Sequence, residues 1–219
     1  MHINLIMEKN TTELTNEYIN EHPHIKNCLK RGLINYSALA RHIAKELDIE
    51  KKSSKEAILI AARRKQDSLK KEFGQEKEIS KLLSDSEIEI KNKIIVFIIE
   101  KNVNFETLEN IQSQIKKESG FSYILEGSDN YTIITQERYV QIIEKSIKNK
   151  IIKLNKNMVL INIKSPKEIE TIPGVVSYLT SLFAENGVNI YEFLSCWTDT
   201  IFIIDSKDLN RSINFLKFE

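Results

Sequence analysis

Thr171-Ile-Pro-Gly-Val-Val-Ser-Tyr-Leu-Thr-Ser-Leu-Phe-Ala-Glu-Asn-Gly-Val-Asn-Ile190 is the stretch that decides the fold. It places Pro173-Gly174 at the start of a short amphipathic helix, ends that helix on Asn186-Gly187 and starts a strand at Val188. The first N–H groups of a helix are unpaired and lie at its positive end, so such a start can hold a carboxylate or phosphate. Asn189 could reach the same ligand. Alternatively, Pro173-Gly174 is only a turn and Asn189 a surface residue.

Outward from this stretch, strands and helices alternate from residue 87 onward. The run Ile94–Ile99 is typical of a buried strand, and Gly127-Ser-Asp-Asn130 is typical of a hairpin turn. The pattern predicts strands at 94–99, 121–125, 131–135, 158–163, 188–194 and 201–204, and helices at 105–117, 137–148, 173–185 and 209–216.

The series occurs twice. Gly120-Phe-Ser-Tyr123 matches Gly187-Val-Asn-Ile190, and Tyr131-Thr-Ile-Ile134 matches Thr200-Ile-Phe-Ile203. Each copy reads β-α-β-β-α, the core of a split βαβ sandwich with helices on one face of an antiparallel sheet. The fold class predicted for this part of the chain is therefore α+β.

An extra short strand is predicted before each copy, at 87–90 and at 151–154, followed by the polar runs Lys91–Lys93 and Asn155–Asn157. No closing strand follows the last helix. Two arrangements are open. Each extra strand forms a hairpin with the next strand of its own copy, or the strands are exchanged, so that 151–154 closes the first copy and 87–90 the second.

The first 84 residues read as helical, with no convincing strand. Apolar residues recur at helical spacing between Ile34 and Leu47, where Asn35 or Ser37 can cap a helix. Ser53 or Ser54 caps the next helix, which runs to about Lys71.

The repeat, the Pro-Gly helix start and Glu185-Asn-Gly-Val-Asn-Ile190 resemble the ACT domain, and most closely the paired ACT units of aspartokinase regulatory regions. Ser195–Asp205 and Lys207–Leu216 are similar to the strand-turn-strand and final helix of that family. The resemblance implies two ferredoxin-like βαββαβ units, at 87–156 and 157–219, after an unrelated helical domain at 1–84. Because the family inserts one unit within the other, it favours the exchanged arrangement, with strand 87–91 completing the second unit.

The resemblance also implies a site for a free amino acid, and binding that alters an attached function. Carried over by position, the site uses Thr171, Ile172, Pro173, Gly174 and Val175, with Asn186, Val188, Asn189 and Ile190 on the facing strand. Many members have an Asp where Thr171 stands here, beside Glu170. The first copy departs further, with Glu106-Thr107 in place of Pro173-Gly174 and Ser122 in place of Asn189.

Charge is uneven along the chain. Residues 51–71 hold 8 Lys or Arg and 2 Asp or Glu, although the net charge of the chain is +1. Ser37–Leu47, a short turn and Ser54–Lys71 resemble a helix-turn-helix pair, in which basic side chains would contact phosphates of DNA. The candidate contacts are Lys55, Arg63, Arg64, Lys65, Lys70 and Lys71. The alternatives are a helical bundle with a solvated charged face, or a surface that docks on an enzyme through Ile58-Leu-Ile60.

Several functions are unsupported by the sequence. It contains no Gly-rich phosphate loop, nucleophile elbow, metal cluster or paired His and Cys, so no enzyme activity, metal or cofactor is expected. No apolar run could span a membrane and Met1–Glu8 is unlike a signal peptide, so a cytoplasmic protein is expected. Cys28 and Cys196 are expected to be buried hydrophobic residues.

The predicted function is a non-catalytic, amino-acid-sensing regulator, dimeric, with the ligand in the second ACT unit and the helical domain as its readout, acting on DNA. The alternative is a free-standing allosteric partner of an amino-acid biosynthetic enzyme. The expected partners are a free amino acid or similar small carboxylate, a second copy of the chain, and DNA or the partner enzyme.

Overall fold

A computed structural model describes residues 9–70 and 74–218. The chain divides into two compact units, 1–77 and 78–219, each of which is described by itself. Lys71, predicted to contact DNA, lies outside the described residues. So does the segment 1–8, which was predicted not to be a signal peptide.

The first unit is a helical bundle in which α4 packs against the three helices before it. Its helices are α1 (Thr11–Glu21), α2 (Pro23–Lys30), α3 (Tyr36–Glu46) and α4 (Lys55–Lys70). The predicted caps are present: the Asn35 side chain accepts from the Ala38 N–H, and the Ser54 hydroxyl accepts from the Ala57 N–H. Residues 47–54 connect α3 to α4, a longer connection than the three or four residues of a helix-turn-helix motif.

The second unit is built on one antiparallel six-stranded sheet, in the order β2-β3-β1-β4-β6-β5. The strands are β1 (Glu87–Glu100), β2 (Ser122–Glu126), β3 (Asn130–Gln136), β4 (Ile151–Lys164), β5 (Ile190–Cys196) and β6 (Asp199–Asp205). The helices are α5 (Gly74–Ser84), α6 (Phe105–Lys117), α7 (Val140–Ile147), α8 (Val175–Glu185) and α9 (Leu209–Phe215), with 3-10 turns η1 (Glu137–Tyr139), η2 (Lys148–Lys150), η3 (Lys167–Glu170) and η4 (Ser206–Asp208).

The two extra strands are the ends of β1 and β4, not separate strands. Glu87–Lys91 pairs with Leu160–Lys164, and Val96–Ile99 pairs with Ile151–Asn155. This is the exchanged pairing, and the hairpin alternative is absent. The polar runs predicted to break the strands stay within them as β-bulges, where Lys93 and Asn157 take left-handed backbone angles (φ 56° and 58°).

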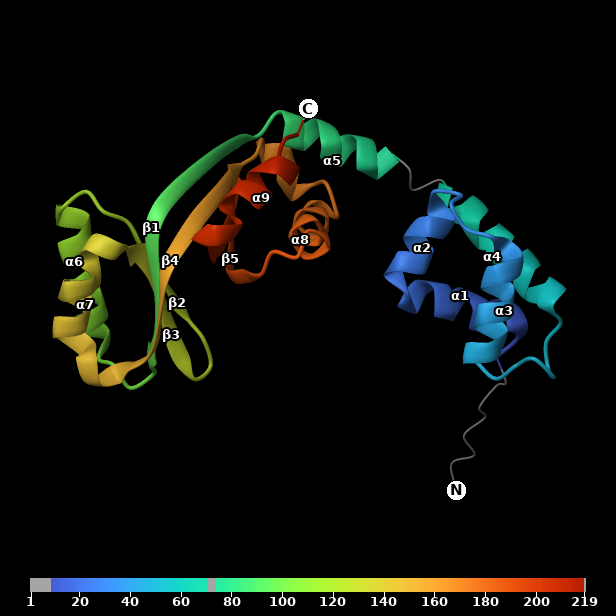
Figure 1. Cartoon of the computed structure of the whole chain (residues 1–219), viewed down its shortest axis with the longest axis horizontal. Helices are drawn as coiled ribbons and strands as arrows, with labels where there is room; N and C mark the ends of the chain where they lie inside the picture. The colour runs from blue at the N-terminus through green and yellow to red at the C-terminus, as the bar shows by residue number, and fades with distance from the viewer. Residues whose placement is uncertain (1–8, 71–73, 219) are drawn as a thin grey trace, which may run out of the picture. The chain divides into compact units, whose positions relative to one another are not determined.

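Alternate residues of the strands point to opposite faces of the sheet, and each face has its own buried clusters. On one face, α6 and α7 cover the β1–β3 end of the sheet, and α5, α8 and α9 cover the β4–β6 end (Figure 1). On the other face, Ile94 and Ile134 share a cluster with Leu160, Ile201 and other strand residues, without a helix. The sheet curls so that this face is buried largely against itself.

The boundary predicted after residue 84 differs from the division at 77, because α5 buries Ile79, Leu82 and Leu83 in the core under α8. The prediction that both cysteines are buried is wrong. Cys28 and Cys196 are exposed, on α2 and at the end of the edge strand β5.

Candidate functional site

The α8 N-terminal loop, defined as Thr171–Val175, presents backbone more than side chains. Gly174 is the N-cap of α8 with φ 91°, a left-handed angle that suits glycine, and no side chain caps the helix. Pro173 is exposed, and the Thr171 hydroxyl donates to the Glu168 carbonyl at 3.0 Å. Val175 is buried in the core, so its side chain is closed to a ligand. The loop therefore offers free N–H groups of the first turn to an anion.

The equivalent helix start in the other half of the sheet is closed. Asn104 caps α6, and its side-chain oxygen accepts from the Glu106 N–H at 3.0 Å. Glu106 and Thr107, placed by the sequence comparison opposite Pro173-Gly174, lie inside the first turn of α6. A side chain thus occupies at α6 the position that is open at α8.

The second predicted set lies at the far end of α8. The Asn186 side chain donates to the Leu182 carbonyl at 2.8 Å as a helix cap, and Val188 is buried. Asn189 is exposed and Ile190 begins β5. The 11 residues of α8 separate this set from the α8 N-terminal loop, which at 1.5 Å per residue is about 16 Å. One chain therefore does not bring the two sets together.

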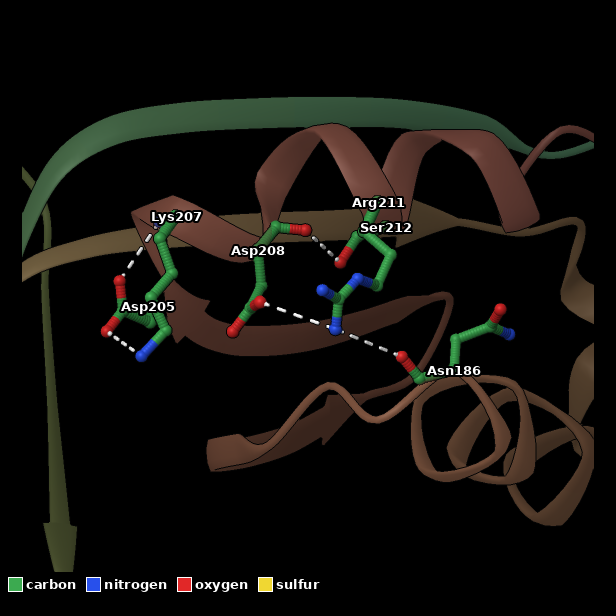
Figure 2. A network of polar contacts seen from close by, with 6 residues as sticks. All are labelled: Asn186, Asp205, Lys207, Asp208, Arg211 and Ser212. Carbon is green, nitrogen blue, oxygen red and sulfur yellow. Dashed lines mark hydrogen bonds and ion pairs between the residues drawn. The ribbon is translucent and has the colours of Figure 1, made fainter.

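A polar network fixes that far end of α8 to α9 (Figure 2). Arg211 donates to the Asn186 carbonyl at 3.4 Å and lies 3.8 Å from the Asp208 carboxylate. Nearby, Asp205 accepts from the Lys207 N–H at 3.0 Å and pairs with its Nζ at 3.2 Å, and these contacts hold the pKa of Asp205 below its ordinary value. Asn186 is therefore a structural residue here.

A cavity of about 390 Å³ lies beside the α8 N-terminal loop, between α5 and the segment before α8. It is lined by Glu78, Lys81, Leu82, Asp85, Pro166, Glu168 and Ile172. Three carboxylates against one ammonium make the lining acidic, so it suits a cationic group. The site predicted from the sequence did not include these α5 residues, because only the fold brings residues 78–85 beside the loop.

The described basic residues proposed for DNA, from Lys55 to Lys70, lie along α4. Lys55, Arg63 and Arg64 are exposed, and Arg63 stacks over the Tyr36 ring at 5.4 Å. Lys65 is half-buried, and Lys70 lies 3.7 Å from Asp67. Of the apolar run proposed for docking, Ile58 is fully buried, Leu59 is half-buried against the bundle core and Ile60 is 48% exposed, so Ile60 offers the most surface to a partner.

Residues 153–217 match the ACT domain family. This ACT segment contains most of β4 and all of α8, β5, β6 and α9, and so the open helix start. No curated protein matches the chain in sequence.

Solved structures that resemble the chain include aspartate kinases and their regulatory parts. The aspartate kinase of Clostridium acetobutylicum is 18% identical with a TM-score of 0.50, over 59% of this chain and 33% of that enzyme. A putative C-terminal regulatory domain of aspartate kinase from Porphyromonas gingivalis is 10% identical (TM-score 0.46, 60% of this chain, 94% of that one). The regulatory subunit of aspartate kinase from Thermus thermophilus is 12% identical (TM-score 0.47, 59% of this chain, 92% of that one). The chain thus spans a third of the Clostridium enzyme, and that likeness is one of fold.

Two further properties bear on the kind of site. Within residues 9–70 and 74–218, no three His, Cys, Asp or Glu side chains are grouped as a metal site. In the same residues, no helix has the length and apolar character needed to span a membrane.

Proposed function

We propose that the chain is a non-catalytic, amino-acid-responsive regulator, and that the α8 N-terminal loop holds the carboxylate of the ligand. The observation that carries this proposal is the open start of α8 within the ACT segment, beside an acidic cavity. The helix start attracts the carboxylate, and the carboxylates of Glu78, Asp85 and Glu168 attract the ammonium. A zwitterion fits both, whereas a plain anion meets the acidic lining.

A second copy of the chain would complete the site. Asn189 and Ile190 are about 16 Å from the loop along α8 in one chain, so they reach a ligand only from another copy. β5 is an edge strand with free backbone groups, and its Tyr191 and Phe193 are 36% and 38% exposed. We propose a dimer through this edge, with two ACT-like units in each chain.

Amino-acid binding is tested by thermal shift and calorimetry with the twenty amino acids. A ligand at 100 times its dissociation constant should raise the unfolding free energy by about 2.7 kcal/mol. Glu168→Gln should weaken binding of that ligand, because it removes a negative charge from the cavity lining. Glu118→Gln, exposed at the end of α6 in the other half of the sheet, is the matched control. If no amino acid stabilises the protein, or if both variants bind alike, this site assignment is wrong.

We propose the helical unit as the readout, with DNA as its target. The exposed Arg63 and Arg64 of α4 favour this target. Anisotropy with random duplex at about 50 mM salt should show binding, and replacing both arginines by alanine should lower the salt slope, by about 0.9 for each lost phosphate contact.

The second candidate is a partner enzyme that docks on exposed Ile60. Ile60→Asp should then abolish capture of the enzyme while the bundle stays folded, since Ile60 is outside its core. DNA binding that Ile60→Asp leaves unchanged would favour the first candidate. If no DNA binding is seen at tens of micromolar protein, DNA is excluded as the target. The proposed ligand site at α8 would be unaffected by that result.

A further inference from the structure

Asn162 is a buried amide with an unused oxygen. It lies on β4 between β1 and β6, where Glu89 is its cross-strand partner. The residue is 9% exposed, and its Nδ2 donates to Asp199 Oδ1 at 2.6 Å. Its Oδ1 is buried with no hydrogen-bond donor among the described residues. Exchanging the two amide atoms would bring that oxygen against the Asp199 carboxylate, so the orientation is fixed by chemistry.

Acidic side chains neighbour Asn162 on both adjacent strands. Asp199 has no ion-pair partner in the described part of the chain, and Glu89, at the rim, pairs with Lys91 at 3.2 Å. Tyr123 of β2 faces the same group: burial raises the pKa of its phenol, and the negative charges of Asp199 and Glu89 raise it further. Lys164 is the Cα partner of both Asp199 and Glu87, so this face carries three carboxylates and two lysines. The net charge around the unpaired amide oxygen is therefore negative.

A cation that can donate hydrogen bonds would complement both the amide oxygen and the negative charge. A buried acceptor without a donor is unfavourable, and a ligand that donates to it would remove that penalty. An ammonium carries three N–H donors and a positive charge, and so satisfies both the amide oxygen and the carboxylate.

We propose that Asn162, Asp199 and Glu89 form a binding site for a small primary ammonium group. In this site the ammonium donates to Asn162 Oδ1 and to the Asp199 carboxylate, with the Tyr123 phenol beside it. Asn162 shares the face of Leu160, opposite the α8 face that holds Ile161 and Ile163. This site is therefore separate from the α8 N-terminal loop and does not depend on the proposed function.

The probe is methylammonium chloride, which has no carboxylate for the α8 loop. In the full chain, the side-chain amide signals of Asn162 should shift saturably with methylammonium in NMR, and sodium chloride at equal ionic strength should leave them unmoved. Asp199→Asn and Asn162→Val should each weaken binding by about tenfold or more, the effect of losing one charged hydrogen bond. Asp205→Asn, at the other end of β6, is the matched control.

A shift that does not saturate, or that sodium chloride reproduces, would overturn the proposal. Potassium or calcium chloride that displaces methylammonium at lower concentration would overturn it in favour of a metal-ion site. Methylammonium binding that survives in Glu168→Gln but not in Asp199→Asn would support it, whatever becomes of amino-acid binding at α8.

Discussion

Ile94 and Met158 face each other as Cα partners where both long strands bend. Each follows a residue with left-handed backbone, Lys93 at φ 56° and Asn157 at φ 58°. The β1–β4 register shifts on either side of Ile94. Because bulges increase local twist and bend, they let each strand serve both ends of the curled sheet.

Lys93→Gly should therefore stabilise the protein. A side chain in the left-handed region costs roughly 1–2 kcal/mol, and glycine avoids this cost while losing about 0.5–1 kcal/mol to chain entropy. A net gain of between about 0 and 1.5 kcal/mol should appear as a higher urea midpoint with an unchanged slope. The control is Lys156→Gly, also exposed in a long strand but without a positive φ. Equal destabilisation by both changes would contradict this account of the bend.

The sequence predicted most elements because their patterns are local. Ile94–Ile99 is an apolar run of strand length, and Pro173-Gly174 with Asn186-Gly187 brackets α8. Continuity of β1 was missed because Lys91–Lys93 combines exposed polar residues with a left-handed angle, a combination typical of a turn. Only the pairing with β4 keeps this run in the sheet.

The candidate site was less predictable. The sequence marked the α8 N-terminal loop, because proline fixes its own φ and glycine readily adopts left-handed angles that other residues avoid. It could not show that Val175 and Val188 turn into the core, or that Asn186 caps α8. The acidic lining from α5 lies some ninety residues earlier in the chain, and no local pattern connects it to the loop.

Glu192→Gln should stabilise the protein at neutral pH. Glu192 lies half-buried on β5, and burial raises the pKa of its carboxyl above the ordinary 4.5. With the folded pKa above the unfolded one, its contribution to stability is present below about pH 4.5 and is lost as pH rises through the folded pKa. Urea unfolding at pH 7 and pH 4 should show a gain at pH 7 that shrinks at pH 4. The exposed Glu185→Gln should show neither, and a gain independent of pH would disprove the titration argument.

Gly174→Ala should cost about 1 kcal/mol of stability, because φ 91° strains any residue with a Cβ. Space is not the cause, since an added Cβ would lie 3.6 Å from Ile79 Cδ1, an ordinary contact. Gly174→Asn should cost less, because asparagine tolerates left-handed angles. Thermal unfolding of the two variants tests this order, and equal losses would point to crowding. The α8 site is therefore better tested with Glu168→Gln than with Gly174→Ala.

Residues 157–219 should not fold alone, although they contain nearly all of the ACT segment. In the whole chain, residues 158–164 pair with both β6 and the start of β1, and α5 covers the core beneath α8. The fragment 157–219 would lose both neighbours and expose an open apolar sheet edge, so it should aggregate or remain unfolded. The fragment 78–219 keeps both and should be folded and cooperative. Size-exclusion chromatography with light scattering and a ¹⁵N–¹H spectrum distinguish the two states. A dispersed, monomeric spectrum from 157–219 would show that the exchanged strand is dispensable. Strand exchange would then not explain why β1 and β4 are each fourteen residues long.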